Sequence, residues 1–592
     1  MKNFRLFDLL TRYADNFDKE DALGAKENGQ WVKYSTRQYI DYSNNISYGL
    51  LNIGVQKGDK IALIANNRPE WNFADMGIMQ TGAVNVPIYP TISENDLVFI
   101  LNDAEVKYIF VSSQDIYDKV NKVKNQCPSI KEIYSFNKIN GVKHWLELVE
   151  SGKQNSSILA DKLGEVKASI TDIELVTLLY TSGTTGNPKG VMLSHKNIVI
   201  DFYAVRNLPP LDPESRVLSF LPLNHVYERM LTYLYMYKGA SIYYAESLET
   251  IGDNIREIKP HVFSAVPRLL EKVYDKIVAK GNELTGIKRK LFFWALNLGL
   301  KYEFDGKNGF WYEIQLKIAN KLIFNKWREA LGGNVRAIVS GGAALQTRLA
   351  RVFSAAGIPV LEGYGLTETS PVISVNNLER GGRKFGTVGP VIEGVEVKIA
   401  DDGEILVKGP NVMMGYYKRP DLTAEVIDSE GWFHTGDIGI LEDGKYLKIT
   451  DRKKEIFKTS GGKYIAPQII ENRLKESLFI EQVMVVGENE KFASALVVPA
   501  FIYLKEWCEK NKITYVSNEE IIKNKDIQKR IQEEVNKVNK SLAQFESIKK
   551  IELLPCEWSI ERGEMTPKLS LKRKVISEAN KQLIDKIYKS GE

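Results

Sequence analysis

Short apolar runs alternate with helix-length segments through most of the chain. Four of these runs lead into small or polar residues: KIALIAN (60–66), AVNVPIY (83–89), KYIFVSS (107–113) and ELVTLLYTS (174–182). Longer stretches such as STRQYIDYSNNISYGLLNIG (35–54) lie between them. This alternation predicts an α/β fold with buried, largely parallel sheets that are covered by helices. Ligands of such sheets bind where loops leave the carboxyl ends of the strands, so we expect the functional site there.

The pattern changes twice further along the chain. Long helices rich in Lys, Leu, Phe and Trp are predicted for 255–331. Residues 386–450 are dense in Val and Gly with frequent turn signals, which indicates antiparallel strands or a small barrel. After DRKK (451–454), a smaller Lys- and Glu-rich mixed region runs to the end. Since 592 residues are too many for one core, we predict two domains: 1–451, with a helical insertion at about 265–331, and 452–592.

Composition and charge argue against several classes of function. The net charge of +5 is small and no nucleic-acid-binding module is found, so nucleic acid is not an expected partner. The three cysteines lie far apart, which argues against a disulfide framework or a spaced zinc site and indicates a reducing compartment. The start lacks the features of a secretory signal, and the longest uncharged apolar run, 291–300, is about half of a membrane span. We therefore expect a cytoplasmic protein.

The segment LVTLLYTSGTTGNPKGVMLSH (175–195) carries the strongest chemical signal. An apolar strand runs into a loop of Thr, Ser and Gly that closes with a lysine followed by Gly190. Glycines let backbone N–H groups wrap an anion, hydroxyls add donors and the lysine adds a cation. The order does not fit the GxxxxGK[ST] P-loop, and a flexible surface turn is the alternative interpretation. The phosphate-binding candidates are Thr181, Ser182, Gly183, Thr184, Thr185, Gly186 and Lys189.

This segment resembles the signature of the adenylate-forming (AMP-binding) superfamily of acyl-CoA synthetases, luciferases and peptide-synthetase adenylation domains. Six further segments follow in that family's order: FLPLNHVYER (220–229), VSGGAAL (339–345), LEGYGLTETSP (361–371), GEILVKGPNVMMGYY (403–417), WFHTGDIG (432–439) and DRKKEIFKTSGGKYIAP (451–467). The first and last of the six, with the helical insertion, are most similar to the long-chain fatty acid–CoA ligase branch. The resemblance implies a large N-terminal domain of two α/β subdomains and a small β-barrel, then a small mobile α+β C-terminal domain.

The resemblance also implies a reaction in two halves. A fatty acid carboxylate attacks the α-phosphate of ATP, which gives an acyl-adenylate and pyrophosphate. The thiol of CoA then displaces AMP and forms a thioester. ATP and CoA are therefore expected as substrates and Mg²⁺ as the metal, with a medium- or long-chain fatty acid as the third partner. Negative charge develops around phosphorus in the first half, so cations and oriented donors are expected to stabilise it.

Residue roles follow from the motifs. Tyr364 offers an aromatic face for adenine, Thr367 can donate to the α-phosphate, and Glu368 is an oxygen ligand suited to Mg²⁺, with Thr181 as a second metal and catalytic candidate. Asp437 resembles the carboxylate that accepts both ribose hydroxyls. Core packing for the tyrosine and a turn position for each carboxylate are the alternatives. The remaining nucleotide-binding candidates are Gly341, Gly342, Glu362, Gly363, Gly365, Arg452, Lys454 and Lys458, with Lys454 at the hinge between the domains.

Three catalytic candidates come from two other parts of the chain. His225 resembles a residue beside the carboxylate and pantetheine paths, although a structural role is an even alternative. In the tail TPKLSLKR (566–573), Ser570 occupies the position where the family carries its adenylation lysine. In an extended segment, alternate residues share a face, so Lys568 and Lys572 are the candidates that replace it.

Three readings of function are left open at this point. The favoured one is a fatty acid–CoA ligase of the AMP-forming type. An acyl-carrier-protein synthetase would use the phosphopantetheine of a carrier protein in place of CoA. A nucleotide-binding homologue with weak turnover is suggested only by Ser570. The helices at 287–300 and 311–327 pair aromatics with lysines, so peripheral contact with the inner face of the membrane is open, as is a homodimer.

Overall fold

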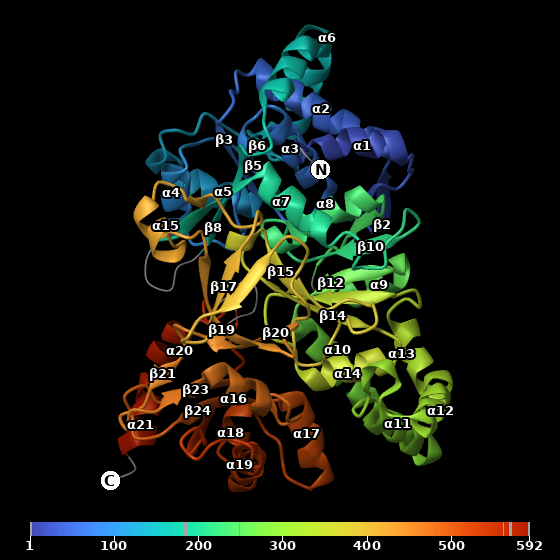
Figure 1. Ribbon diagram of the computed structural model, residues 1–592, viewed down its shortest axis with the longest axis vertical. Helices are drawn as coiled ribbons and strands as arrows, with labels where there is room; N and C mark the ends of the chain where they lie inside the picture. The colour runs from blue at the N-terminus through green and yellow to red at the C-terminus, as the bar shows by residue number, and fades with distance from the viewer. Residues whose placement is uncertain (1–2, 182–186, 248, 560–561, 567–570, 590–592) are drawn as a thin grey trace.

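The computed structural model describes residues 3–181, 187–247, 249–559, 562–566 and 571–589. In these ranges the chain forms two eight-stranded sheets, a four-stranded sheet, and a C-terminal region with sheets of two and three strands. The first eight-stranded sheet and the C-terminal region lie at opposite ends of an elongated molecule (Figure 1). No helix within the described ranges is long and apolar enough to cross a membrane.

The first sheet contains the four apolar runs read from the sequence, which become β3 (Lys60–Ile64), β4 (Val84–Pro87), β5 (Val106–Val111) and β8 (Leu175–Thr181). These strands pair in parallel, as predicted. The order is β18-β9-β8-β4-β3-β5-β6-β7, with β6 (Glu132–Ser135), β7 (Lys143–His144), β9 (Lys189–Ser194) and β18 (Gly415–Tyr416) completing it. Both faces are covered by helices, which explains why the strands are apolar throughout rather than alternating.

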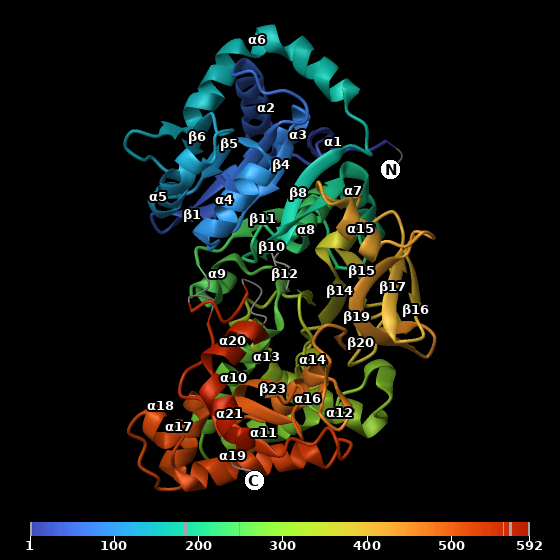
Figure 2. The ribbon, with the colours of Figure 1, turned by 90° about the vertical axis from the view of Figure 1, so that its left-hand side faces the viewer.

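Alternate residues of each strand pack into different helical layers. On β3, Ile61 and Leu63 belong to one buried cluster, whereas Ala62 and Ile64 belong to another. The first cluster includes residues of α2 (Thr36–Asn52), α3 (Pro69–Gln80) and α6 (Trp145–Ser169); the second includes residues of α4 (Glu94–Asp103) and α5 (Gln114–Val123). Figure 2 shows these helices on either side of the strands.

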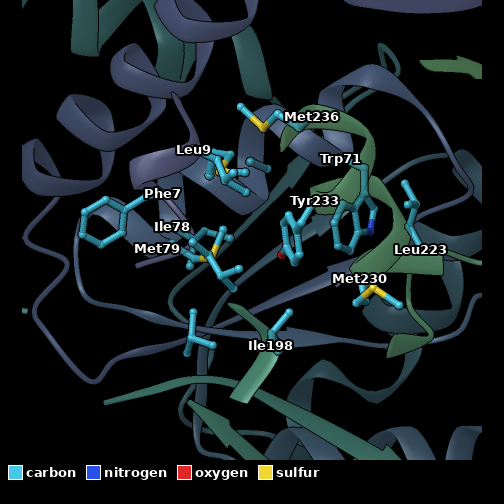
Figure 3. Close-up of a cluster of buried hydrophobic side chains, with 14 of the residues drawn as sticks. Phe7, Leu9, Trp71, Ile78, Met79, Ile198, Leu223, Met230, Tyr233 and Met236 are labelled. Carbon is cyan, nitrogen blue, oxygen red and sulfur yellow. The ribbon is translucent and has the colours of Figure 1, made fainter. Parts of the chain in front are cut away.

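The second sheet is joined to the first by a shared core. Its order is β15-β14-β13-β12-β10-β11-β1-β2. The strands are β1 (Leu23–Glu27), β2 (Gln30–Tyr34), β10 (Arg216–Ser219), β11 (Ser241–Tyr244), β12 (Val262–Ala265), β13 (Ala337–Ser340), β14 (Val360–Gly365) and β15 (Val372–Val375). Helix α8 (Val226–Lys238) is buried on almost every face, and its Met230 and Tyr233 lie in one cluster with Trp71 and Ile78 of α3 (Figure 3). Helices α1 (Asp8–Asn16) and α7 (His195–Ala204) also contribute buried residues to this core.

The stretch predicted to be helical contains four long or medium helices around its own core. They are α9 (Ile251–Ile258), α10 (Pro267–Glu283), α11 (Gly286–Gly299) and α12 (Phe310–Ala319), followed by a π-helix (Asn320–Phe324) and α13 (Asn325–Ala330). Phe292, Trp327 and residues of α14 (Thr347–Ala355) are buried together there.

The Val- and Gly-rich segment forms β16 (Glu396–Ile399), β17 (Glu404–Lys408), β19 (Phe433–Glu442) and β20 (Tyr446–Arg452). All three pairings are antiparallel, as predicted. Strands β16 and β20 are the two edges, so the described strands form an open sheet rather than a closed barrel. Helix α15 (Pro420–Val426) crosses beside it.

The residues after β20 build cores of their own. The strands are β21 (Phe457–Lys458), β22 (Tyr464–Ile465), β23 (Ile480–Val486), β24 (Ser494–Pro499) and β25 (Lys550–Leu553). The helices are α16 (Pro467–Leu474), α17 (Phe501–Lys510), α18 (Asn518–Ile521), α19 (Lys525–Asn539), α20 (Arg573–Ala579) and α21 (Lys581–Lys589). Arg268 of α10 holds this region against the helical stretch, because its guanidinium pairs with Glu481 and lies 3.3 Å from the carboxylate of Glu557.

Candidate active site

The strands that flank the hydroxyl-rich segment in the sequence form a β-hairpin. Strands β8 and β9 pair antiparallel, with Tyr180 opposite Gly190 and Thr181 opposite Lys189. Thr181 and Lys189 therefore stand next to each other at the base of the loop. The intervening candidates Ser182, Gly183, Thr184, Thr185 and Gly186 lie outside the described residues.

A carboxylate, a phenol and a lysine meet beside this hairpin. Tyr416 of β18 donates a 2.9 Å hydrogen bond to Oε1 of Glu368. The Nζ atom of Lys189 lies 5.0 Å from the centre of the Tyr416 ring, within cation–π range. The Glu368 backbone is anchored as well, since its carbonyl oxygen accepts a 2.8 Å hydrogen bond from Met413 N. The fold thus brings together residues from three motifs that span 189–416.

A second polar group forms around a buried aspartate. Asp437 of β19 is 4% exposed, and its Oδ2 accepts a 2.7 Å hydrogen bond from the hydroxyl of Tyr364. Its Oδ1 lies 3.3 Å from Nε of Arg452, the residue opposite it on β20. Burial raises the pKa of Asp437, while Arg452 and the Tyr364 hydroxyl oppose that rise. The negative charges of Glu455 and Glu368 add to the rise in the pKa of Asp437.

The glycines predicted to lie near the nucleotide differ in whether the structure could accept a side chain at their positions. A Cβ on Gly365 would lie 1.7 Å from the carbonyl oxygen of Pro371, so no side chain fits. Gly342 has φ +82°, a conformation that L-residues rarely adopt. A Cβ on Gly363 would lie 3.5 Å from the nearest side-chain atom, which is an ordinary contact distance. A Cβ on Gly341 would lie 3.3 Å from the nearest side-chain atom.

Glu362 ties this glycine-rich loop to β14. Its carboxyl group is 8% exposed, and burial raises its pKa to about 8, although the N–H of Leu345 lowers it by donating to the carboxylate. Leu345 closes the segment VSGGAAL, so the contact joins that segment to the strand that carries Tyr364. Thr367 is 6% exposed in the turn that follows.

His225 is the residue that caps α8. Its Nδ1 accepts a 3.1 Å hydrogen bond from Tyr227 N, which accounts for the structural alternative raised from the sequence. One turn further, Arg229 is 1% exposed and pairs with Asp75 of α3 at 2.6 Å. Sequence reasoning did not find this pair, because the partner is 154 residues away.

Comparison with known proteins identifies the family. The model of the AMP-binding enzyme family matches residues 10–417, and that of the AMP-binding enzyme C-terminal domain matches residues 454–592. The chain belongs to the AMP-binding enzyme family. A long-chain-fatty-acid–CoA ligase of Mycobacterium bovis is 33% identical over 95% of this chain and 93% of its own. Long-chain-fatty-acid–CoA ligase 1 of Homo sapiens is 34% identical over 96% of this chain and 84% of its own.

Solved structures place this AMP-binding enzyme in the expected fold. The adenylation domain of a carboxylate reductase from Mycobacterium chelonae matches with a TM-score of 0.76 at 22% identity, over 99% of this chain and 91% of that one. Together with the separate C-terminal match, this confirms the α/β fold with a distinct C-terminal domain predicted from the sequence.

The hinge lysines of this AMP-binding enzyme lie on its surface. Lys454 is exposed in the turn after β20, and Lys458 is exposed on β21, where its Nζ lies 5.4 Å from the ring centre of Tyr464. Arg452, two residues before Lys454, contacts the buried Asp437. The roles of the two lysines stay predictions.

The residues on either side of the basic tail segment are described, but those in its middle are not. Met565 and Leu571 form an antiparallel bridge, and Lys572 is the exposed residue that precedes α20. Lys572 has non-helical backbone angles, with φ -90° and ψ 80°, and the role expected for it stays a prediction. Lys568 and Ser570 lie outside the described residues.

Arg573, which sequence reasoning missed, links the tail to the hinge. Its Nη2 lies 2.6 Å from both carboxylate oxygens of Glu471, and its Nε lies 3.0 Å from Oε2 of Glu455. Glu455 follows Lys454 directly. The signal in the sequence was an arginine within the basic string LKRK and two acids near the hinge, but no spacing rule connects them.

Proposed function

We propose that this AMP-binding enzyme is an acid–thiol ligase that converts a fatty acid, ATP and CoA to acyl-CoA, AMP and pyrophosphate. The observation that carries the proposal is the convergence of Glu368 and Lys189 at one hairpin, together with the effect of Glu368 on the pKa of Asp437. The relatives named long-chain-fatty-acid–CoA ligases, which align with 95% or more of the chain, support the choice of substrate.

The nucleoside would be held by the group around Asp437. A carboxylate offers two acceptor oxygens, which suits two ribose hydroxyls. The hydrogen bond from Tyr364 holds its ring beside that carboxylate, where adenine can stack on it. Arg452 favours the charged form of this carboxylate, because its positive charge opposes the rise in pKa that burial causes.

The phosphates and a Mg²⁺ ion would be held at the hairpin. Mg²⁺ uses few protein carboxylates and otherwise keeps water and phosphate oxygens. Glu368 fits this role, because one hydrogen bond from Tyr416 leaves most of its acceptor capacity for a cation. Thr181 is the hydroxyl candidate at the same hairpin. Bound Mg²⁺ would offset negative charge on the phosphates, and Lys189 would supply a second cation.

In the first half-reaction, a carboxylate oxygen of the acid bonds to the α-phosphorus of ATP. The bond to the bridging oxygen breaks, and pyrophosphate leaves with that electron pair. In the second, the deprotonated sulfur of CoA bonds to the acyl carbon, and AMP leaves with the electrons of the C–O bond. Holding the reactants in line at this hairpin supplies the positional part of the catalysis.

The second step would require the C-terminal domain to change position. We place the division between residues 451 and 452, at the end of β20, with Lys454 as the hinge. Lys568 or Lys572 would supply the charge that Ser570 lacks. Acid-dependent ATP–pyrophosphate exchange should fall in Lys568→Ala, Lys572→Ala or the double variant. Unchanged exchange in all three would remove both lysines from the mechanism.

Contact with the cytoplasmic face of a membrane is the second part of the proposal. Phe310 and Trp311 are 73% and 75% exposed at the start of α12, and Lys317 and Lys321 lie exposed on the same helical stretch. Apolar side chains flanked by lysines favour an anionic lipid surface. The protein should co-float with phosphatidylglycerol vesicles, and Phe310→Ser/Trp311→Ser should not. Exposed Ile158 on α6 is the control: Ile158→Ser should float like the wild type.

The deciding experiment measures pyrophosphate release with a series of saturated acids of increasing length, with and without CoA. Release that depends on the acid, and thioester that forms only with CoA, supports the ligase. Thioester with a purified acyl carrier protein but not with CoA would identify a carrier-protein synthetase. ATP binding without acid-dependent release would contradict both.

A further inference from the structure

A fully buried ionic network lies behind the hairpin that carries the hydroxyl-rich loop. Arg229 of α8 and Asp75 of α3 are each 1% exposed. Nη2 of Arg229 lies 2.6 Å from Oδ1 of Asp75, and Tyr233, on the next turn of α8, bonds to both residues. Figure 3 shows Tyr233 and Trp71 lying next to each other in this core.

One arm of the network reaches the strand that leads into the loop. Nη1 of Arg229 donates a 2.7 Å hydrogen bond to Oγ1 of Thr177 on β8. The Thr177 hydroxyl in turn donates to the backbone oxygen of Asn85 on β4 at 2.8 Å, and the Asn85 amide donates to Asp75 at 2.6 Å. The four polar residues therefore close a ring that includes two neighbouring strands.

This ring lies at the junction between β4 and β8. Strands β3 and β4 pair over four residue positions, and β8 pairs with β9 over six. The register between β4 and β8 contains one pair in the described structure, Asn85 with Thr177. The buried network thus holds the two residues that define the register between β4 and β8.

The network also includes a residue in the first turns of α8, the helix that His225 caps. Arg229 lies one turn into α8, and its backbone N–H donates to the His225 oxygen at 3.1 Å. On β8, alternation places Thr177 and Thr181 on the same face, four residues apart. The Arg229 guanidinium therefore links the first turn of α8 to the strand that ends at Thr181.

We propose that Thr177 and Arg229 are positioning residues, which hold the β8–β9 hairpin in register so that Thr181 and Lys189 can bind the phosphates of ATP. Their side chains are buried and act through the strand rather than on the nucleotide. The proposal rests on the proposed function for the identity of the site, although it requires only ATP binding. A buried polar ring of this kind is rigid because each donor that loses its partner is left desolvated.

Thr177→Val tests this most directly, since it removes the hydroxyl and keeps the branched shape. Thr177→Ser keeps the hydroxyl and is the conservative rescue. Thr232→Val is the matched control: Thr232 is 2% exposed on α8, and its hydroxyl bonds the carbonyl oxygen of Glu228 on its own helix. Calorimetry gives the affinity for ATP, hydrogen–deuterium exchange reports on peptides covering 175–194, and thermal unfolding reports on overall stability.

We expect Thr177→Val to weaken ATP binding about 10- to 100-fold and to speed exchange in 175–194 more than elsewhere. Thr177→Ser should bind ATP within about threefold of the wild type, as should Thr232→Val. The proposal would be overturned if Thr177→Val and Thr232→Val had the same ATP affinity and the same rate of hydrogen exchange in 175–194. A variant that melts earlier and exchanges faster throughout while its ATP affinity is unchanged would also overturn it, since that is a purely structural effect.

Failure of the proposed function gives a different result. Wild-type protein that binds ATP but shows no acid-dependent pyrophosphate release contradicts the ligase. The comparison of Thr177→Val with Thr232→Val then still decides the positioning role, because neither ATP affinity nor hydrogen exchange depends on the acid.

Discussion

The hydroxyl of Tyr364 donates a 2.7 Å hydrogen bond to Oδ2 of Asp437, and this bond joins the strand β14 of one sheet to the strand β19 of another. The two residues are 73 positions apart in the chain. The bond orients the aromatic ring and occupies only part of the acceptor capacity of the carboxylate. The contact therefore makes one surface from two motifs, an aromatic face beside a pair of acceptor oxygens.

Replacing Asp437 should weaken ATP use more than replacing its partner. Asp437→Asn loses the charge and one acceptor, so KM for ATP should rise about 10- to 100-fold. Tyr364→Phe removes one neutral hydrogen bond and keeps the carboxylate and ring, so the rise should stay within about 10-fold. Initial rates of pyrophosphate release against ATP concentration measure both. Equal KM values in Asp437→Asn and the wild type would remove Asp437 from the ribose site.

Glu368→Gln should change the dependence on Mg²⁺. A neutral amide binds the ion poorly, so the Mg²⁺ concentration at half-maximal rate should rise and the rate at fixed Mg²⁺ should fall by about 100-fold. Tyr416→Phe is the control, because it removes the hydrogen bond to Oε1 and leaves the carboxylate. Chelation should abolish the wild-type rate, and added Mg²⁺ should restore it. A Mg²⁺ titration of Glu368→Gln that overlays the wild type would exclude Glu368 as a ligand.

Glu362 should make thermal stability fall as pH rises. Its folded pKa is about 8 and its unfolded value is 4.5, so between these values the folded state holds a proton that the unfolded state has released. Stability is then full below pH 4.5 and declines by up to about 1.4 kcal/mol per pH unit until pH 8. The melting temperature of Glu362→Gln should decline less than that of the wild type between pH 5 and 8.

The exposed Glu165 on α6 provides the control for that titration. Glu165→Gln should keep the wild-type slope of melting temperature against pH. If Glu362→Gln also keeps it, the Glu362 carboxyl does not hold its proton in the folded protein.

Two glycines on one strand should respond differently to a methyl group. Gly365→Ala places a Cβ 1.7 Å from the Pro371 oxygen, so β14 and β15 must separate next to Glu368. We expect a lower melting temperature and a loss of ATP affinity of about 10-fold or more. In Gly363→Ala the new Cβ would lie 3.5 Å from the nearest side-chain atom, so this variant should have the melting temperature and the ATP affinity of the wild type. Calorimetry and thermal unfolding distinguish them, and equal behaviour of the two variants would contradict the packing described here.

Sequence patterns predicted the parts of the fold that depend on local order. The runs at 60–66, 83–89, 107–113 and 174–182 became parallel strands because apolar runs of that length between helices have few other ways to be buried. The segment 35–54 became α2, which begins after the Ser35 cap. The candidates Thr181, Lys189, Glu368 and Asp437 were also named from motifs, since each motif is a short string with its own chemistry.

Tertiary structure alone decided how these strings face one another. The Arg229–Asp75 pair, the bond from Tyr416 to Glu368, and the bidentate contact of Arg573 with Glu471 each join residues far apart in the chain. No local pattern specifies such partners, because they are selected by how helices and strands pack and by the cost of leaving a buried charge unpaired.

The tail shows the same division. By itself, the string TPKLSLKR determined that basic residues lie near Ser570 in the chain, and it suggested an extended strand. In the described residues, Met565 bridges Leu571, α20 starts at Arg573, and that arginine pairs with Glu455 and Glu471. Chain order thus determined which chemical groups this protein has. Packing decided which of them meet, because a buried guanidinium is stable only where carboxylates from other elements surround it.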